Sequence, residues 1–150
     1  MATEAPDTAL ELRARALRLL ARREHSRTEL ERKLAPHAES PLAVEIVLAG
    51  LKEKNQLSDE RYAAERMRVL QRKYGAAKIR HDLKSKGVDA RIIDRISAED
   101  DLERARAILA RKYRAPAGTR AERAKRMRFL QSRGFSSEII FQLLSARDAD

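Results

Sequence analysis

One pattern of eleven residues occurs twice in this chain, beginning at Leu83 and again at Leu130, and it is typical of a corner where one helix ends and the next begins. In the first copy, Gly87 lies four residues after Leu83 and directly before Val88. A glycine that ends a helix in the left-handed conformation brings the following residue back onto the last turn, so Val88 is expected to contact Leu83. The second copy predicts the same corner around Gly134.

The same residues also specify the start of the following helix. Asp89 is a good N-cap, which places Val88 and Ile93 at the two positions that form a hydrophobic staple. In the second copy these positions are held by Ser136, Phe135 and Ile140. Because one corner is specified by several independent local rules and occurs twice, the chain is expected to consist of tandem helical modules.

The repeat extends beyond the corners. Residues 69–74 resemble residues 108–113, and residues 19–24 resemble both, which indicates a third and weaker copy. Within that copy, residues 26–29 form a capping box and residues 40–41 supply an N-cap followed by proline. The sequence therefore predicts an all-α fold of three tandem three-helix modules in an elongated, curved molecule. Its predicted parts are a flexible N-terminus at 1–9, modules at 10–56, 57–97 and 98–146, and a flexible C-terminus at 147–150.

Composition agrees with a helical protein and excludes several classes. The chain has only 5 Gly and 4 Pro in 150 residues, and no apolar run is long enough to cross a membrane. Cysteine is absent, so neither disulfides nor thiolate metal sites can form. The first seven residues are polar and acidic, unlike a signal peptide, and we expect a cytoplasmic protein.

No pattern indicates an enzyme, a cofactor or a metal site. His25, His37 and His81 lack the spacing of metal ligands, and the chain has neither a glycine-rich phosphate loop nor a nucleophile elbow. Acidic residues cluster at 99–103, but carboxylates in a first helical turn are favoured by the helix dipole, which we prefer to a metal-nuclease interpretation.

The net charge of +10 is the main functional clue in the composition. Nine lysines leave 24 arginines among the 33 basic residues, and arginine is the better bidentate partner for phosphates and carboxylates. On a helical wheel, Arg68 and Arg72 lie opposite Tyr62 and Leu70. A charged outer face can be merely solvated, but the excess over the whole chain favours a polyanionic partner.

Aromatic residues are few and fit apolar faces. Tyr62, Tyr74 and Tyr113 are interpreted as core residues rather than base-stacking platforms. In the helix expected from 120 to 133, an inner face made of Ala124, Met127 and Leu130 leaves Phe129 pointing away. Phe129 then either packs against a neighbouring module or contacts a partner.

Four blocks, in this order, resemble the RecX family of recombinase regulators: 19–30 (LLARREHSRTEL), 57–63 (LSDERYA), 75–87 and 128–136 (RFLQSRGFS). Each block alone is largely a helix corner, and the order and spacing over about 19–140 make the combination specific. Gly75 is followed by Ala76 where the family often has proline, and both residues suit a first helical turn.

The resemblance implies a monomer without cofactors that binds the filament of the RecA recombinase on DNA and inhibits its ATP hydrolysis and strand exchange. The residues expected to dock electrostatically on RecA or DNA are the outward basic ones in the matching blocks: Arg22, Arg23, Arg68, Arg72, Lys84, Lys86, Arg126 and Arg133. Lys86 and Arg133 are also at helix C-termini, where the dipole alone explains a cation.

Two other classes stay open. A non-specific binder of single-stranded and duplex DNA needs no recombinase, and three-helix modules resemble helix-turn-helix units. No expected helix presents Asn, Gln and Arg together on one face, which argues against sequence-specific reading. A structural adaptor for another acidic protein is the third possibility.

Overall fold

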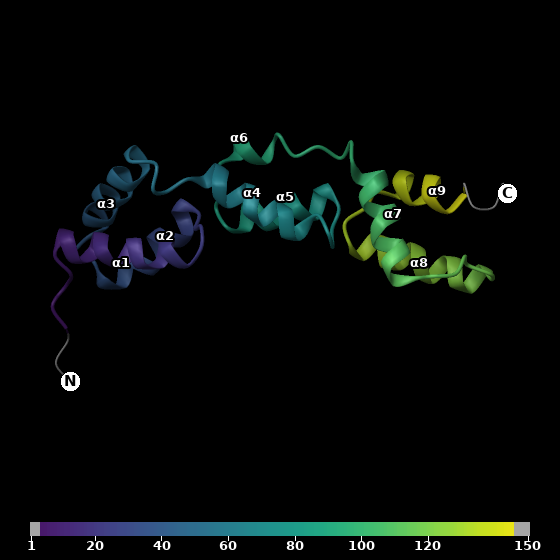
Figure 1. Ribbon diagram of the computed structural model, residues 1–150, viewed down its shortest axis with the longest axis horizontal. Helices are drawn as coiled ribbons and strands as arrows, with labels where there is room; N and C mark the ends of the chain where they lie inside the picture. The colour runs from purple at the N-terminus through teal and green to yellow at the C-terminus, as the bar shows by residue number, and fades with distance from the viewer. Residues whose placement is uncertain (1–3, 146–150) are drawn as a thin grey trace. The chain divides into compact units, whose positions relative to one another are not determined.

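The computed structural model describes residues 4–145, and within that range the chain is entirely helical (Figure 1). Three helices make up each of three successive modules, as the sequence predicts. The elements are α1 (Ala9–Arg22), α2 (Arg27–Leu34), the 3₁₀ turn η1 (Ala35–His37), α3 (Pro41–Glu53), α4 (Asp59–Leu70), α5 (Ala76–Ser85), α6 (Ala90–Ile93), α7 (Asp101–Lys112), α8 (Arg120–Ser132) and α9 (Ser137–Ser145). The first three residues and residues 146–150, which include the flexible C-terminus predicted at 147–150, lie outside the described range.

The first module packs α1, α2 and α3 around one apolar core (Figure 1). The Thr8 side chain accepts a hydrogen bond from the Glu11 N–H and starts α1, and Ser26 and Ser40 cap α2 and α3 in the same way. Each cap satisfies a backbone donor that the first helical turn leaves unpaired. The core residues are Leu12, Ala16, Leu30, Leu34, Val44, Val47, Leu48, Leu51 and Leu57.

The two glycine corners form as the sequence predicts. Gly87 has φ +73° and Gly134 has φ +89°, both in the left-handed region. The N–H of Val88 donates to the Leu83 carbonyl at 3.1 Å, and the N–H of Phe135 donates to the Leu130 carbonyl at 3.3 Å. Each bond joins the residue after the glycine to the carbonyl five residues earlier, which is the wider of the two hydrogen bonds in a Schellman motif. The corners therefore end α5 and α8 at the predicted positions.

The third module has a core of its own, made by α7, α8 and α9 (Figure 1). Phe135 and Ile140 both belong to it, as expected for a staple at the second corner. Its buried residues are Ala105, Ile108, Leu109, Leu130, Phe135, Ile140, Leu143 and Leu144. In the second module, by contrast, the helix after the corner is the single turn α6, and Ile93 is only half-buried.

Two features join the first module to the second: the Asp59 carboxylate and the corner at Gly87. The carboxylate of Asp59, the first residue of α4, accepts a hydrogen bond at 2.8 Å from the N–H of Arg27, the first residue of α2. The hydroxyl of Ser26 donates to the Lys86 carbonyl at 2.7 Å, and a Cβ added at Gly87 would lie 2.3 Å from the Thr28 hydroxyl oxygen. The start of α2 is thus capped from α4 and covered by the end of α5.

The second joint repeats this arrangement one module later. Asp101, the first residue of α7, accepts hydrogen bonds at 3.0 and 3.3 Å from the N–H of Ala76, the first residue of α5. The Gly75 N–H donates to the Arg133 carbonyl at 2.9 Å, and a Cβ added at Gly134 would lie 2.6 Å from the Cβ of Lys78. The glycines are therefore needed for close approach between modules as well as for their positive φ.

Contacts between residues divide the chain into two compact units, and the two joints explain where the division falls. One compact unit comprises the residues up to Glu65 together with Leu83–Ile92, and the other comprises Arg66–Asp82 together with the residues from Ile93 onward. The boundary falls inside α4 and α5 and again before the last residue of α6. The start of α4 and the end of α5 thus belong with the first module, and the remainder of both helices belongs with the third.

Candidate functional site

One face of α8 carries a basic residue, an aromatic residue and a second basic residue at helical spacing. Arg126 and Phe129 are three residues apart, and Arg133, the C-cap residue of α8, follows four residues later, so the three side chains lie on the same side of the helix. Tyr113 follows the end of α7, and Tyr74 precedes α5. The second joint brings these segments together, because the corner at the end of α8 lies on the start of α5.

The result is a group of three aromatic rings and four cations, which we call the cation–aromatic cluster. Its members are Tyr74, Lys78, Lys112, Tyr113, Arg126, Phe129 and Arg133. The Tyr113 and Phe129 rings meet edge to face, with centroids 6.2 Å apart and an interplanar angle of 81°.

Each cation lies over at least one ring. The Lys112 Nζ is 3.8 Å from the Phe129 centroid, and the Arg126 Cζ is 4.4 Å from the Tyr113 centroid. The Arg133 Cζ is 5.0 Å from the Phe129 centroid and 5.6 Å from the Tyr74 centroid. At these distances the negative face of an aromatic ring attracts a cation.

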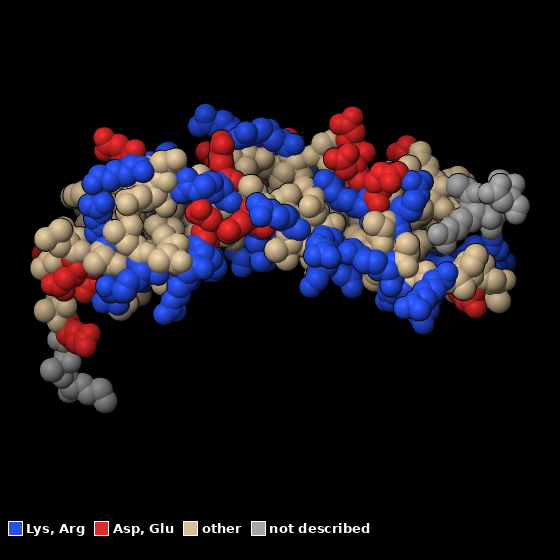
Figure 2. Space-filling model, viewed as in Figure 1, with Lys and Arg blue, Asp and Glu red and all other residues tan. Residues whose placement is uncertain are grey.

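The cluster is not neutralised by carboxylates. Across residues 4–145, none of its four cations forms an ion pair with an Asp or Glu side chain. Aromatic rings hold the cations in place without cancelling their charge. Lys78 and Lys112 are exposed, so the positive potential extends into solvent. Figure 2 shows Lys and Arg side chains crowded over the region of α7 and α8.

Arg126 corrects the sequence prediction, because it does not point outward. Its residue is 5% exposed, and its Nε and Nη1 atoms have no hydrogen-bond partner within the described part of the chain. Met127, predicted to face inward, is 41% exposed. The guanidinium lies over the Tyr113 ring, so the inner face of α8 is rotated toward Arg126. A wheel built from apolar residues alone cannot show this, since it treats every arginine as polar.

Phe129 follows neither of the two alternatives drawn from the sequence. The ring is half-buried and packs on the core of its own module, against Tyr113. Lys112 and Arg133 lie over the same ring.

The remaining predicted residues of this unit are Arg68, Arg72 and Arg133. Arg68 is exposed on the side of α4 opposite buried Tyr62 and Leu70, and Arg72 is exposed in the turn after α4, where the helix predicted to continue has already ended. The Arg72 carbonyl accepts a hydrogen bond from the Arg111 guanidinium, which ties the end of α4 to α7. Arg133 is half-buried within the cluster.

The other four predicted residues lie in the unit that contains the first module. Arg22 and Lys84 are exposed, with no ion pair among the described residues. Arg23 is bound by Glu29 in a two-pronged ion pair, so part of its charge is cancelled. Lys86 is half-buried, and its carbonyl belongs to the first joint.

Lys78 and Lys112 were missed by the sequence interpretation. Each is adjacent to, or one helical turn from, a tyrosine, and this basic–aromatic spacing is the signal that could have indicated them. The Lys78 ammonium also donates to the Ser132 carbonyl at 2.7 Å, which fixes it at the second joint.

Neither a metal centre nor a membrane segment is found in the described range. No group of three or more His, Asp or Glu side chains between residues 4 and 145 is arranged to hold a metal ion. Among the same residues, no helix has both the length and the apolar character needed to cross a bilayer.

These features define a class of protein: a tandem array of three three-helix modules with an excess of unneutralised cations. Three family models match the chain in order. They describe the first, second and third three-helix domains of RecX, and they match residues 13–50, 58–95 and 99–144.

Curated relatives agree over nearly the whole chain. A protein of Leptothrix cholodnii named regulatory protein RecX is 44% identical, over 99% of this chain and 95% of the relative. Proteins of the same name from Ralstonia nicotianae and Neisseria gonorrhoeae are each 40% identical, over 96% and 86% of this chain. The chain belongs to the RecX family of regulatory proteins.

Solved structures agree on the fold. The crystal structure of RecX from Lactobacillus salivarius has a TM-score of 0.79 at 22% identity, covering 95% of this chain and 97% of that one. A second crystal structure, of a regulatory protein RecX, has a TM-score of 0.70 at 23% identity, with 97% and 81% coverage.

Proposed function

We propose that this protein is a negative regulator of the RecA recombinase that binds the RecA–DNA filament and inhibits its ATP hydrolysis and strand exchange. Membership of the RecX family supports a regulatory role. The observation that carries the site assignment is the cation–aromatic cluster, whose four cations have no carboxylate partners among the described residues. The protein acts by binding rather than by catalysis, as a cytoplasmic monomer.

The chemistry of the cluster suits a phosphate backbone beside acidic protein. The exposed ammonium groups of Lys78 and Lys112 can each meet a phosphate or a carboxylate, and the rings beneath them limit their motion. Cations held in place lose less side-chain entropy on binding than free ones. Arg68 of α4 and Arg72 in the turn that follows it add exposed charge within the same unit.

Non-specific DNA binding without a recombinase is the second candidate, and the net charge of +10 favours it. Such binding releases counterions, so it weakens steeply as salt rises and depends little on sequence. This property is compatible with a filament regulator, and the two functions differ in whether RecA is needed for tight association.

The experiment that tests the proposal is RecA ATP hydrolysis on single-stranded DNA with increasing amounts of this protein. We expect inhibition at substoichiometric amounts. Unchanged hydrolysis at a one-to-one ratio, with the protein folded by circular dichroism, would overturn the RecA proposal in favour of simple DNA binding.

A pair of charge reversals tests the surface. Arg68→Glu with Arg72→Glu is expected to keep the helical content and weaken inhibition, because both side chains are exposed. The matched control is Lys52→Glu with Lys54→Glu, which makes the same charge change at exposed positions near the end of α3. Equal loss of inhibition in both double variants would show that only net charge matters.

A further inference from the structure

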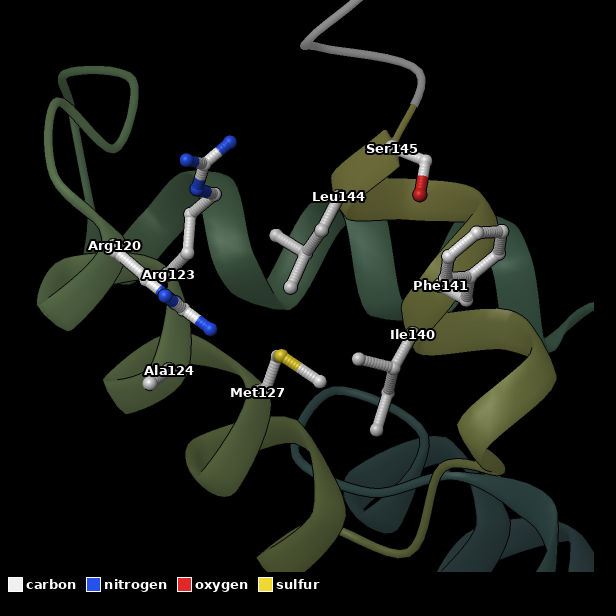
Figure 3. A pocket seen from close by; sticks show the side chains of 8 residues that line it. All are labelled: Arg120, Arg123, Ala124, Met127, Ile140, Phe141, Leu144 and Ser145. Carbon is white, nitrogen blue, oxygen red and sulfur yellow. The ribbon is translucent and has the colours of Figure 1, made fainter.

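A pocket of about 400 Å³ lies between α8 and α9 in the third module (Figure 3). The side chains of Met127, Ile140 and Leu144 point toward one another across it, and Ala124 completes its apolar wall. Ile140 and Leu144 also belong to the core of the module, so the floor of the pocket is fixed by packing.

Two large apolar side chains at this pocket are open to solvent. Phe141 is 70% exposed and Met127 is 41% exposed. A methionine in the lining makes an adaptable apolar surface, because its side chain can take several shapes. Apolar residues that line a shared hollow are more typical of a binding site than single exposed ones.

A basic residue lies at the edge of the pocket. Exposed Arg120, the first residue of α8, lines it together with the apolar residues, and none of its lining residues between 4 and 145 is Asp or Glu. The complementary ligand is therefore apolar with a negative charge beside it.

The pocket and the cation–aromatic cluster use different faces of α8. Arg126, Phe129 and Arg133 share one face, while Arg120, Ala124 and Met127 lie on another side of the helix. Leu130, fully buried, separates the two faces. Substitutions at one surface can therefore be made without touching the other.

We propose that the α8–α9 pocket is a protein-docking site that takes an acidic amphipathic helix of a partner. Two helices flanking an apolar hollow form the kind of groove that receives the apolar face of a third helix. Apolar side chains of the partner fill the space beside Met127 and Phe141, and a carboxylate of the partner meets Arg120. The inference does not depend on the function proposed above, because it concerns a different surface.

The test is a titration of the full chain with a synthetic helical peptide that has leucines at i, i+4 and i+7 and glutamates at the flanking positions. The protein is labelled at its methionine methyl groups, and NMR follows Met127, with half-buried Met67 of α4 as an internal reference. We expect a saturable shift at Met127 only. Replacing the glutamates of the peptide by lysines should abolish it.

Variants distinguish binding at the pocket from non-specific association. Phe141→Ser should weaken peptide binding about tenfold. Leu42→Ser, at an apolar residue of α3 that is 67% exposed, is the matched control and should have no effect. Arg120→Glu should favour the lysine peptide over the glutamate peptide.

Four results would overturn the proposal. Equal shifts at Met67 and Met127, or equal weakening by Leu42→Ser, would show non-specific association. Tighter peptide binding after removal of residues 146–150 would identify the occupant as the chain itself. A dimer in sedimentation that Phe141→Ser converts to a monomer would identify a second copy as the occupant.

Discussion

Replacement of Asp101 by alanine should destabilise the second joint far more than its place in a first helical turn suggests. The residue is 3% exposed, and both carboxylate oxygens accept from the Ala76 N–H, at 3.0 and 3.3 Å. The same carboxylate receives the Arg104 guanidinium at 3.0 Å, with side-chain exposures of 13% for Arg104 and 5% for Asp101. The sequence analysis explained the carboxylate of Asp101 by the helix dipole, which accounts for only a small part of the expected loss of stability.

The magnitude follows from what the substitution leaves behind. An unpaired buried N–H costs about 1–3 kcal/mol, and removing one partner of a buried ion pair costs about 3–5 kcal/mol. Arg104 keeps weaker contacts with the Ser97 carbonyl at 3.4 Å and with Asp100 at 3.9 Å, so the lower part of the range applies. We expect Asp101→Ala to cost about 3 kcal/mol.

Two controls set the scale. Asp59→Ala removes the equivalent cap at the first joint, a half-buried carboxylate with one hydrogen bond at 2.8 Å, and should cost about 1 kcal/mol. Asp101→Asn keeps an acceptor for Ala76 but cannot neutralise Arg104, and should fall between the two.

The assay is urea unfolding of the full chain, followed by circular dichroism, together with hydrogen exchange at the Ala76 amide. Exchange at that amide reports opening of the joint directly, even where unfolding of three modules is not two-state. The reasoning is refuted if Asp101→Ala costs no more than Asp100→Ala, since the Asp100 side chain is 78% exposed.

Three further predictions concern stability. Gly134→Ala should cost about 2 kcal/mol, because φ is +89° and the new Cβ would lie 2.6 Å from the Cβ of Lys78. The control is Gly50→Ala in α3, where the new Cβ meets nothing within 4 Å, and this variant should be more stable. Chemical denaturation of the two variants compares their free energies of unfolding. Burial lowers the pKa of His25 in the folded protein, so the unfolded chain binds more protons, and the free energy of unfolding should fall as pH drops below about 6.5. Unfolding free energies measured at several pH values should show no such loss in His25→Gln. Arg126→Met loses a cation–π contact worth about 2 kcal/mol, but it also removes a buried charge with two nitrogens that have no hydrogen-bond partner among the described residues. The melting temperature should therefore stay level or rise. A loss of stability above about 2 kcal/mol would contradict this account of the buried guanidinium.

The helix corners were determined by the sequence alone. Gly87 and Gly134 have positive φ, and the bonds from Val88 and Phe135 reach the predicted carbonyls. Each corner depends on residues within about one turn of one another, so the local chain contains all the groups that must pair.

The exposed faces were predictable to the same extent. Arg68 is exposed on the side of α4 opposite Tyr62 and Leu70, because the helical period fixes which residues share a side. Arg72 is exposed too, in the turn that follows the end of α4. Whether these arginines dock on a partner stays a prediction.

Only the tertiary structure decided the roles of Asp59, Asp101 and Arg126. The backbone donors that Asp59 and Asp101 cap belong to a helix of the preceding module, 32 and 25 residues away in the chain. Arg126 is buried because Tyr113, on another helix boundary, supplies a ring to stack on. A helical pattern gives the direction of a side chain but not what lies in that direction, and the partner is set by how the modules pack.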